Sequence, residues 1–198
     1  ATTYGLVAYQ TAYLKANYTV EYMASVLTAF RDNAEKVAAA VAECRRLGIS
    51  VLPPDVHASH LEFSVEGPAI RFGLLAVKNV GQGAIESIIA AREGEGPFRS
   101  FADFCGRVDL RLVNKRVLES LVKVGALNAF GHPAQLLLAL DDVLATAQAD
   151  QRERASGQLS FFDLAAEPSS LEAPLPSATE VPVRARPRWA KERLGLYL

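Results

Sequence analysis

The pattern of apolar and polar positions along the chain predicts mostly helices. Apolar residues recur at the spacing of an amphipathic helix over residues 3–16 and 20–30, with a break near Asn17. A third helical pattern follows Asp32, a good N-terminal cap, and stops at Gly48, which suits the left-handed conformation of a helix C-terminus. The first quarter of the chain is therefore expected to form three helices.

A short β-hairpin is predicted next. Pro53 and Pro54 keep residues 52–55 extended, because proline lacks an amide hydrogen and disfavours a helical residue before it. Apolar runs at residues 63–65 and 70–72 then flank the turn sequence Glu66-Gly67-Pro68-Ala69. The fold class is therefore expected to be mainly α with one small β-hairpin.

The central segment carries a turn between two short helical patterns, residues 72–78 and 84–92. The turn residues are Asn79, Val80, Gly81, Gln82 and Gly83. Its two glycines allow a tight turn and close approach of a ligand to the backbone. The helix that follows begins with unpaired amide hydrogens at the positive end of its dipole, an arrangement that binds phosphate, and Lys78 adds a charge. The pattern is typical of a helix-hairpin-helix element that holds a nucleic-acid backbone, and a plain tight turn is the alternative.

A second unit of the same layout follows the first. Ser100 opens a short helix with a capping-box pattern, Asn114 caps another through residue 123, and a longer helix starts near Pro133. The turn between the last two, Val124-Gly125-Ala126-Leu127, lacks Gly-x-Gly, so we expect it to complete the core without holding phosphate. The layout predicts a tandem helix-hairpin-helix domain with a pseudo-two-fold relation.

Charge is spread unevenly along the chain. The 198 residues carry a net charge of −1, which excludes a strongly basic nucleic-acid binder and makes any such binding local. Residues 71–123 hold nine basic and six acidic residues, and Lys115 and Arg116 among them are candidates to bind DNA phosphates beside Lys78. Residues 156–183 hold no basic and four acidic residues, and five of the ten prolines fall at 168–187, so this stretch is predicted to be a linker.

Further signals narrow the class of protein. Cys44 and Cys105 lack the spacing of metal ligands, so we expect reduced thiols and a cytoplasmic location. His57 and His60 would suit a metal only on a helix, which this segment is not expected to form, so no metal ligand is predicted. The chain has no run of 18 apolar residues and is not expected to cross a membrane. It starts at Ala1, and both ends resemble cuts through a longer protein.

Two aromatic groups leave alternatives open. Five of the six tyrosines lie in the first 22 residues, which is typical of a packing face or, alternatively, of a surface near bases. The linker contains an apolar string made of Gln158, Leu159, Ser160, Phe161 and Phe162. Its aromatic residues either fold back on the helices or form a short linear motif that docks in an apolar pocket of a partner.

Several longer strings of residues, in order along the chain, are specific enough to compare with a family. The strings are Tyr9-Gln10-Thr11-Ala12-Tyr13-Leu14-Lys15-Ala16, Glu43-Cys44-Arg45-Arg46-Leu47-Gly48-Ile49, Leu52-Pro53-Pro54-Asp55-Val56, Ile70-Arg71-Phe72-Gly73-Leu74, Lys78-Asn79-Val80-Gly81 and Asn114-Lys115-Arg116-Val117-Leu118-Glu119-Ser120-Leu121. Together they resemble the C-family replicative polymerases of bacteria, the DNA polymerase III alpha subunits. The resemblance covers nearly the whole chain apart from the linker.

The resemblance implies four parts. Residues 1–69 would end the fingers domain, 70–155 would form the tandem helix-hairpin-helix DNA-binding domain, 156–187 would be an acidic linker with a sliding-clamp-binding motif at 158–162, and 188–198 would lead towards an oligonucleotide-binding barrel. The family motif usually has an aliphatic residue where Phe161 stands. The implied partners are the duplex DNA backbone, the sliding clamp, the rest of the polymerase chain and other replicase subunits.

The resemblance also implies a DNA-directed DNA polymerase, a nucleotidyltransferase that uses magnesium in the full-length protein. The catalytic carboxylates of the family lie in the palm, upstream of this chain, so the chain alone is expected to hold no cofactor and to be inactive. The alternatives are a non-enzymatic helix-hairpin-helix adaptor or repair protein, and an interaction scaffold. The strings at 9–16 and 52–56 argue against both, because generic hairpin binding needs neither. An accessory error-prone polymerase of the same family also stays open.

Overall fold

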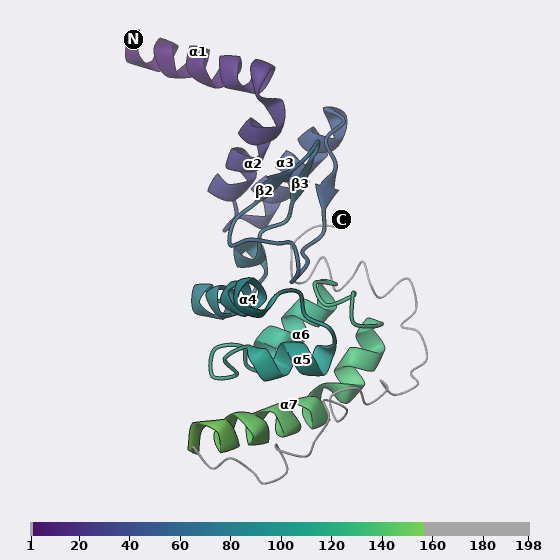
Figure 1. The fold of residues 1–198 in the computed structure, drawn as a ribbon. Helices are drawn as coiled ribbons and strands as arrows, with labels where there is room; N and C mark the ends of the chain where they lie inside the picture. The colour runs from purple at the N-terminus through teal and green to yellow at the C-terminus, as the bar shows by residue number, and fades with distance from the viewer. Residues whose placement is uncertain (1, 157–198) are drawn as a thin grey trace.

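Helices dominate the structure, a computed structural model that describes residues 2–156. The elements are α1 (Thr2–Asn17), α2 (Thr19–Ala29), α3 (Ala34–Arg46), β1 (Val51–Leu52), β2 (Ser64–Glu66), β3 (Ala69–Arg71), the 3₁₀ turn η1 (Leu74–Ala76), α4 (Gln82–Glu95), α5 (Phe101–Arg107), α6 (Lys115–Lys123) and α7 (Pro133–Ser156). In Figure 1, α1 to α3 lie with the sheet at one end of the molecule and α4 to α7 lie at the other. The predicted mainly α fold with a small β element is confirmed.

The sheet has three strands in the order β1-β3-β2. β2 and β3 form the predicted antiparallel hairpin, with Val65 opposite Ile70. β1 pairs in parallel with β3, placing Val51 opposite Ile70 as well. The sheet therefore joins the segment after α3 to the strand that leads into η1. It fixes the direction in which the chain enters the turn between η1 and α4.

Helix α1 projects from the rest of the molecule (Figure 1). The tyrosines at positions 4, 9, 13 and 18 are exposed, whereas Tyr22 of α2 packs against the core. Within the described residues, the predicted aromatic packing face therefore includes Tyr22 and leaves the other four rings uncovered. The alternative, a surface near bases, stays a prediction.

An ion-pair group fastens α1 to α3. The Lys15 ammonium donates to Glu43 Oε1 at 2.8 Å, and Arg46 donates to both carboxylate oxygens of Glu43 at 2.7 and 2.8 Å. Hydrogen bonds from Arg46 and then Lys15 lower the pKa of Glu43 to about 2. This carboxylate therefore stays charged at any physiological pH and holds the C-terminal end of α1 against α3.

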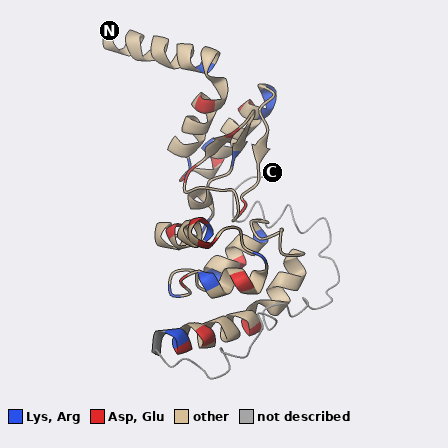
Figure 2. Ribbon diagram, in the orientation of Figure 1, with Lys and Arg blue, Asp and Glu red and all other residues tan. Residues whose placement is uncertain are grey.

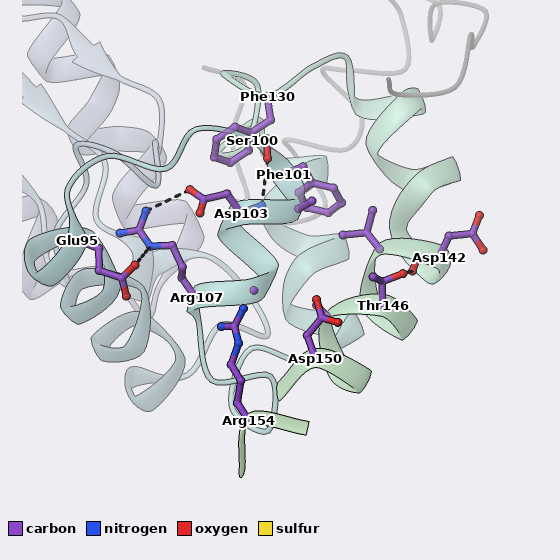
Figure 3. Close-up of a pocket in the computed structure, with 14 residues that line it drawn as sticks. Glu95, Ser100, Phe101, Asp103, Arg107, Phe130, Asp142, Thr146, Asp150 and Arg154 are labelled. Carbon is purple, nitrogen blue, oxygen red and sulfur yellow. Dashed lines mark hydrogen bonds and ion pairs between the residues drawn. The ribbon is translucent and has the colours of Figure 1, made fainter. Parts of the chain in front are cut away.

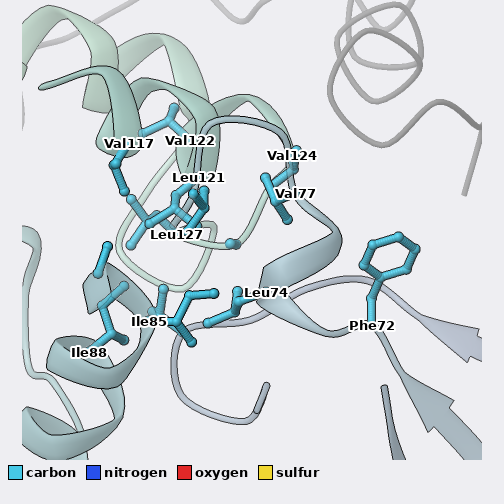
Figure 4. Packing of buried hydrophobic residues seen from close by; sticks show 14 of the residues in the cluster. Phe72, Leu74, Val77, Ile85, Ile88, Val117, Leu121, Val122, Val124 and Leu127 are labelled. Carbon is cyan, nitrogen blue, oxygen red and sulfur yellow. The ribbon is translucent and has the colours of Figure 1, made fainter. Parts of the chain in front are cut away.

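One continuous hydrophobic core connects the end that holds the sheet with the end that holds α4 to α7. Figure 4 shows side chains from η1, α4, α6 and the turn after α6 converging on it. Leu74, Ile85, Leu121 and Leu127 in this group have no exposed surface. Because apolar burial is the main favourable term in folding, this packing holds the turn between η1 and α4 against α6.

Gly73 allows two segments to cross closely before that turn. A Cβ atom on Gly73 would lie 2.4 Å from the carbonyl carbon of Glu62. The amides of Leu74 and Leu75 donate to carbonyls of the crossing segment, those of residues 60 and 61, both at 3.0 Å. Since these amides are used between segments, the helix predicted for residues 72–78 does not form, and only the short η1 is helical there.

The helix caps are mostly those that the sequence predicts. Side-chain oxygens of Ser100 and Asn114 accept hydrogen bonds from first-turn amides at 3.1 and 3.2 Å. The prediction for α3 is wrong by one residue, because its cap is Asn33, which accepts from the amide of Lys36 at 3.0 Å. Asp32 precedes that cap and lies near the Arg31 guanidinium instead.

Candidate nucleic-acid interface

The turn between η1 and α4 is shaped by an asparagine. Asn79 has a φ of 68°, and it is the one non-glycine residue with positive φ in the described part of the chain. Gly81 has a φ of −83° and a ψ of 159°, which any residue can adopt. The expectation that the two glycines make the turn is therefore wrong. Asparagine tolerates the left-handed region because its short polar side chain can bond locally.

The two glycines instead leave the backbone of the turn without covering side chains. A Cβ atom on Gly81 would meet no atom within 4 Å, so nothing in the described structure lies over this position. A Cβ atom on Gly83 would contact only the side-chain methyl groups of Leu112, at 3.7 and 3.8 Å. Both glycines could therefore accept a Cβ atom without a clash. The absence of side chains at these two positions therefore lets a ligand approach the backbone closely.

Helix α4 begins without a side-chain cap. Gly81 is its N-cap residue and supplies no side-chain acceptor, whereas Asn33, Ser100 and Asn114 cap α3, α5 and α6. The amides in the first turn of any α-helix lack intrahelical acceptors. The start of α4 is thus an open group of donors at the positive end of a 14-residue helix, which suits an anion.

Helix α6 lies against this turn and brings basic residues to it. The Asn79 side-chain amide lies 3.4 Å from Ser120 Oγ, which in turn donates to the Arg116 carbonyl at 2.9 Å. Arg116 is one helical turn before Ser120 and on the same face of α6. Lys78 directly precedes Asn79 in the sequence, and the hydrogen bonds through Ser120 place the backbone of Arg116 close to the turn.

Most basic side chains in residues 71–123 are already occupied. Arg71, Arg107, Arg111, Lys115 and Lys123 pair with carboxylates, and Arg92 donates to the Val56 and Ser59 carbonyls. Within the described residues, the side chains of Lys78, Arg99 and Arg116 have no such partner. Acidic and basic positions are interspersed over the ribbon in Figure 2. Anion binding is therefore expected to depend on the cations without a carboxylate partner more than on the net charge of the segment.

Lys115 differs from its neighbour Arg116. Its ammonium lies 2.5 Å from Asp141 Oδ1 of α7, and that hydrogen bond raises the pKa of Lys115. Both side chains are more than half exposed, so the pair is accessible to solvent. The structure therefore brings Lys78, Arg116 and the turn together, and it directs Lys115 towards α7. Gln82 donates to Glu86 along α4, at 2.7 Å.

The turn after α6 is built into the core. Val124, Ala126 and Leu127 are buried, and the Ala126 carbonyl accepts from the Val56 amide at 3.0 Å. Gly125 has a φ of 83°, and a Cβ atom there would lie 2.7 Å from the Asn128 side chain. The expectation that this second turn is structural agrees with its burial.

A cavity of about 350 Å³ lies between α5 and α7 (Figure 3). The Arg107 side chain at its edge is only 10% exposed, and its guanidinium donates to the carbonyls of Ala91 and Gly96 and pairs with Asp103. Arg107 therefore holds the loop after α4 in place. The sequence pattern did not single it out, since the backbone carbonyls that it bonds are brought to it only by the fold.

The remaining chemistry-bearing residues serve the packing. His57 Nε2 lies 3.1 Å from the Phe98 carbonyl, and its ring packs against Phe98 and Phe130. The described residues contain no group of three or more His, Cys, Asp or Glu side chains that could hold a metal. Cys44 and Cys105 are buried, and burial raises the pKa of the Cys105 thiol to about 12. No helix in residues 2–156 is long and apolar enough to cross a membrane.

Short helices pack around these turns, and the helix-hairpin-helix motif family matches residues 48–136 of the chain. Over its whole length the chain is similar to one segment of DNA polymerase III subunit alpha. It is 48% identical to the Thermus aquaticus protein, 41% to that of Vibrio cholerae and 42% to that of Escherichia coli. All of this chain is covered in each case, but only 16–17% of each relative. The resemblance predicted from the sequence is confirmed.

Not all candidate site residues fall in the described part of the chain. The eight predicted DNA-binding residues do: Lys78, Asn79, Val80, Gly81, Gln82, Gly83, Lys115 and Arg116. The predicted clamp-binding residues 158–162, the linker beyond residue 156 and residues 188–198 lie outside it.

Proposed function

We propose that this chain is the portion of a bacterial replicative DNA polymerase that holds duplex DNA by its backbone. The observation that carries the proposal is the open start of α4, with no side chain at Gly81. The unpaired cation Lys78 directly precedes the turn, and a second one, Arg116, belongs to the helix bonded to it through Ser120. Amide donors and point charges of this kind bind phosphates without reading bases. The similarity to polymerase subunits and the match to the helix-hairpin-helix family support it.

The proposal extends to the whole protein. The division is the one expected above: fingers for residues 1–69, tandem hairpins for 70–155, a linker for 156–187 and the approach to a barrel for 188–198. The complete protein would transfer nucleotides to a primer in the cytoplasm, together with the other replicase subunits. Magnesium would be held by the palm carboxylates, which the resemblance places upstream of this chain.

Duplex binding should depend on Lys78 and Arg116. Each change to alanine is expected to weaken binding about five- to tenfold at 0.1 M salt, equally for different DNA sequences, and to lower the slope of log affinity against log salt by about one. Fluorescence anisotropy with several duplexes over a salt series measures both quantities. Arg99→Ala is the matched control, because Arg99 is also exposed and unpaired but lies beyond the far end of α4. Equal effects at all three positions would contradict the proposal.

We also propose that residues 158–162 bind the sliding clamp. The support is the sequence, a glutamine followed by a leucine and two aromatic residues within an acidic linker, together with the resemblance. Leu159, Phe161 and Phe162 would fill an apolar pocket and Gln158 would make the polar contact. This tether would raise the local concentration of DNA for the polymerase.

Removing the two aromatic residues of the motif should abolish measurable clamp binding. Truncating a buried aromatic anchor typically costs about 2 kcal/mol or more, or roughly thirtyfold in affinity. Phe161→Ala combined with Phe162→Ala is therefore expected to lose the clamp in a calorimetric titration while keeping DNA affinity. Leu171→Ala, also in the linker, serves as the control. A lower melting temperature with unchanged clamp affinity would show instead that the two rings pack on the helices.

A further inference from the structure

The cavity between α5 and α7 follows α7 almost to the end of that helix. Its α7 side is formed by residues that recur on one face of the helix: Asp142, Val143, Thr146, Ala147, Asp150 and Arg154. In Figure 3, Arg154 lies at the opposite end of the lining residues from Phe130. Helix α7 ends at Ser156, two residues after Arg154. The cavity therefore extends to the point where the next part of the chain begins.

The lining of this cavity is mainly apolar. Phe101 and Ala147 are buried in its wall, and Phe130 and Val143 are half-buried beside them. Its volume of about 350 Å³ lies within the range of about 300–1,000 Å³ that is typical of ligand pockets. At its edge, Arg107 Nε has no hydrogen bond within the described residues, although the guanidinium pairs with two carboxylates. Such a lining suits apolar side chains with one polar group among them.

The sequence that follows α7 contains a segment of this kind. Gly157 comes directly after the helix, and a glycine at this position commonly adopts the left-handed conformation that turns the chain away from the helix axis. Residues 158–162 follow, with three apolar side chains, one amide and no charge. Six extended residues span about 20 Å, as do about 13 residues of helix. A chain that turns back at Gly157 can therefore bring Phe162 level with Val143.

We propose that residues 158–162 dock in the cavity between α5 and α7 while no clamp is bound, so that the cavity and the clamp compete for Phe161 and Phe162. The inference rests on the proposed function, since it concerns the same residues as the proposed clamp-binding motif. Burial of two aromatic rings against apolar walls favours the docked state. The short tether to α7 gives the segment a high effective concentration at the cavity.

Docking of this kind would regulate attachment to the clamp. The apparent affinity for the clamp is the intrinsic affinity multiplied by the fraction of motif that is undocked. The two alternatives for the aromatic residues, packing on the helices and docking in a partner, are then two states of one segment.

Filling the cavity from its α7 side should strengthen clamp binding. Thr146 lines the cavity from an exposed position, and its hydroxyl donates to the Asp142 carbonyl one turn earlier, so a tryptophan there fills the opening without entering the core. Thr146→Trp is expected to bind the clamp about fivefold more tightly, if the motif is docked about 80% of the time. Ala145→Trp is the matched control, because Ala145 is exposed on the same helix but does not line the cavity. Calorimetric titration measures clamp affinity, and thermal unfolding verifies that both variants are folded.

A disulfide cross-link locates the motif directly. Ser160 is about 13 Å along an extended segment from the end of α7, which is level with Thr146. Thr146→Cys combined with Ser160→Cys should therefore form an intramolecular disulfide with oxidised glutathione, and excess clamp should prevent it. Ala145→Cys with Ser160→Cys is the control and should link at least fivefold less, as measured by mass spectrometry of the digested protein. Cys44 and Cys105 are buried and do not compete.

The other outcomes separate the inference from the function beneath it. If the two tryptophan variants bind the clamp equally and the two cysteine pairs link equally, the motif binds the clamp but does not dock in the cavity. A cross-link of Thr146→Cys to Ala190→Cys, beside Trp189, in place of the link to Ser160→Cys would assign the cavity to another part of the chain and overturn the inference. If neither the unchanged chain nor any variant binds the clamp, the proposed clamp binding and the competition are both overturned.

Discussion

Replacing Gly81 with leucine should weaken duplex binding by about tenfold or more while leaving the protein folded. The backbone at Gly81 suits any residue, and no described atom lies within 4 Å of a Cβ atom built there. The free energy of unfolding should therefore change by no more than about 1 kcal/mol. A leucine side chain would instead stand over the first-turn amides of α4, where we place a phosphate. Loss of a charge-assisted hydrogen bond costs about 1.5–3 kcal/mol, or roughly ten- to a hundredfold.

The matched control for this change lies in the same helix. Gly94 is near the other end of α4 and also has no atom within 4 Å of a Cβ position. Gly94→Leu should keep DNA affinity and raise stability by up to about 1 kcal/mol, because leucine favours a helix over glycine. Gly83→Leu should weaken binding as Gly81→Leu does, and it should also displace Leu112. Anisotropy titration and urea unfolding give the two readouts, and full affinity in the Gly81 variant would remove the hairpin from the DNA surface.

Replacing Gly73 with alanine should lower the free energy of unfolding by about 3 kcal/mol. The new Cβ atom would lie 2.4 Å from the Glu62 carbonyl carbon and 2.7 Å from the Phe63 amide nitrogen, so backbone must move. Such overpacking typically costs 1–3 kcal/mol, and a clash with backbone belongs at the upper end. The displaced segment also makes hydrogen bonds to the amides of Leu74 and Leu75, which would weaken together.

Urea unfolding of the Gly73→Ala variant beside Gly94→Ala tests this expectation. The same change at Gly94 should be neutral or stabilising by up to about 1 kcal/mol, since only helix propensity is involved. A loss below about 1 kcal/mol at Gly73 would mean that the crossing segment can move away without breaking its contacts.

Local signals explain which elements could be read from the sequence. The caps at Ser100 and Asn114 are correct because a cap depends on a side chain and an amide a few residues apart. The cap of α3 is displaced by one residue because Asp32 and Asn33 are both good acceptors. Only the path of the chain into the helix decides between them. The hairpin of β2 and β3 follows equally from its turn residues.

Long-range contacts decided what the sequence could not. The helix predicted for residues 72–78 competes with hydrogen bonds from its amides to the carbonyls of residues 60 and 61. The pattern of apolar residues within 72–78 does not reveal that residues 60–62 cross it in space. The parallel pairing of β1 with β3 is likewise a contact between distant segments. In both places, hydrogen bonds to distant segments determined the backbone conformation, rather than the propensities of neighbouring residues.

The candidate site divides in the same way. The sequence by itself indicated the resemblance to DNA polymerase III alpha subunits, the position of the turn and the basic residues near it, because these are properties of residue type and spacing. Only the tertiary structure decided that Asn79 makes the turn, that Lys115 pairs with Asp141, and that Arg116 comes beside the turn. The physical reason is that charge pairing and side-chain direction depend on which helices pack together. That packing follows from the buried apolar faces of η1, α4, α6 and α7 as a whole.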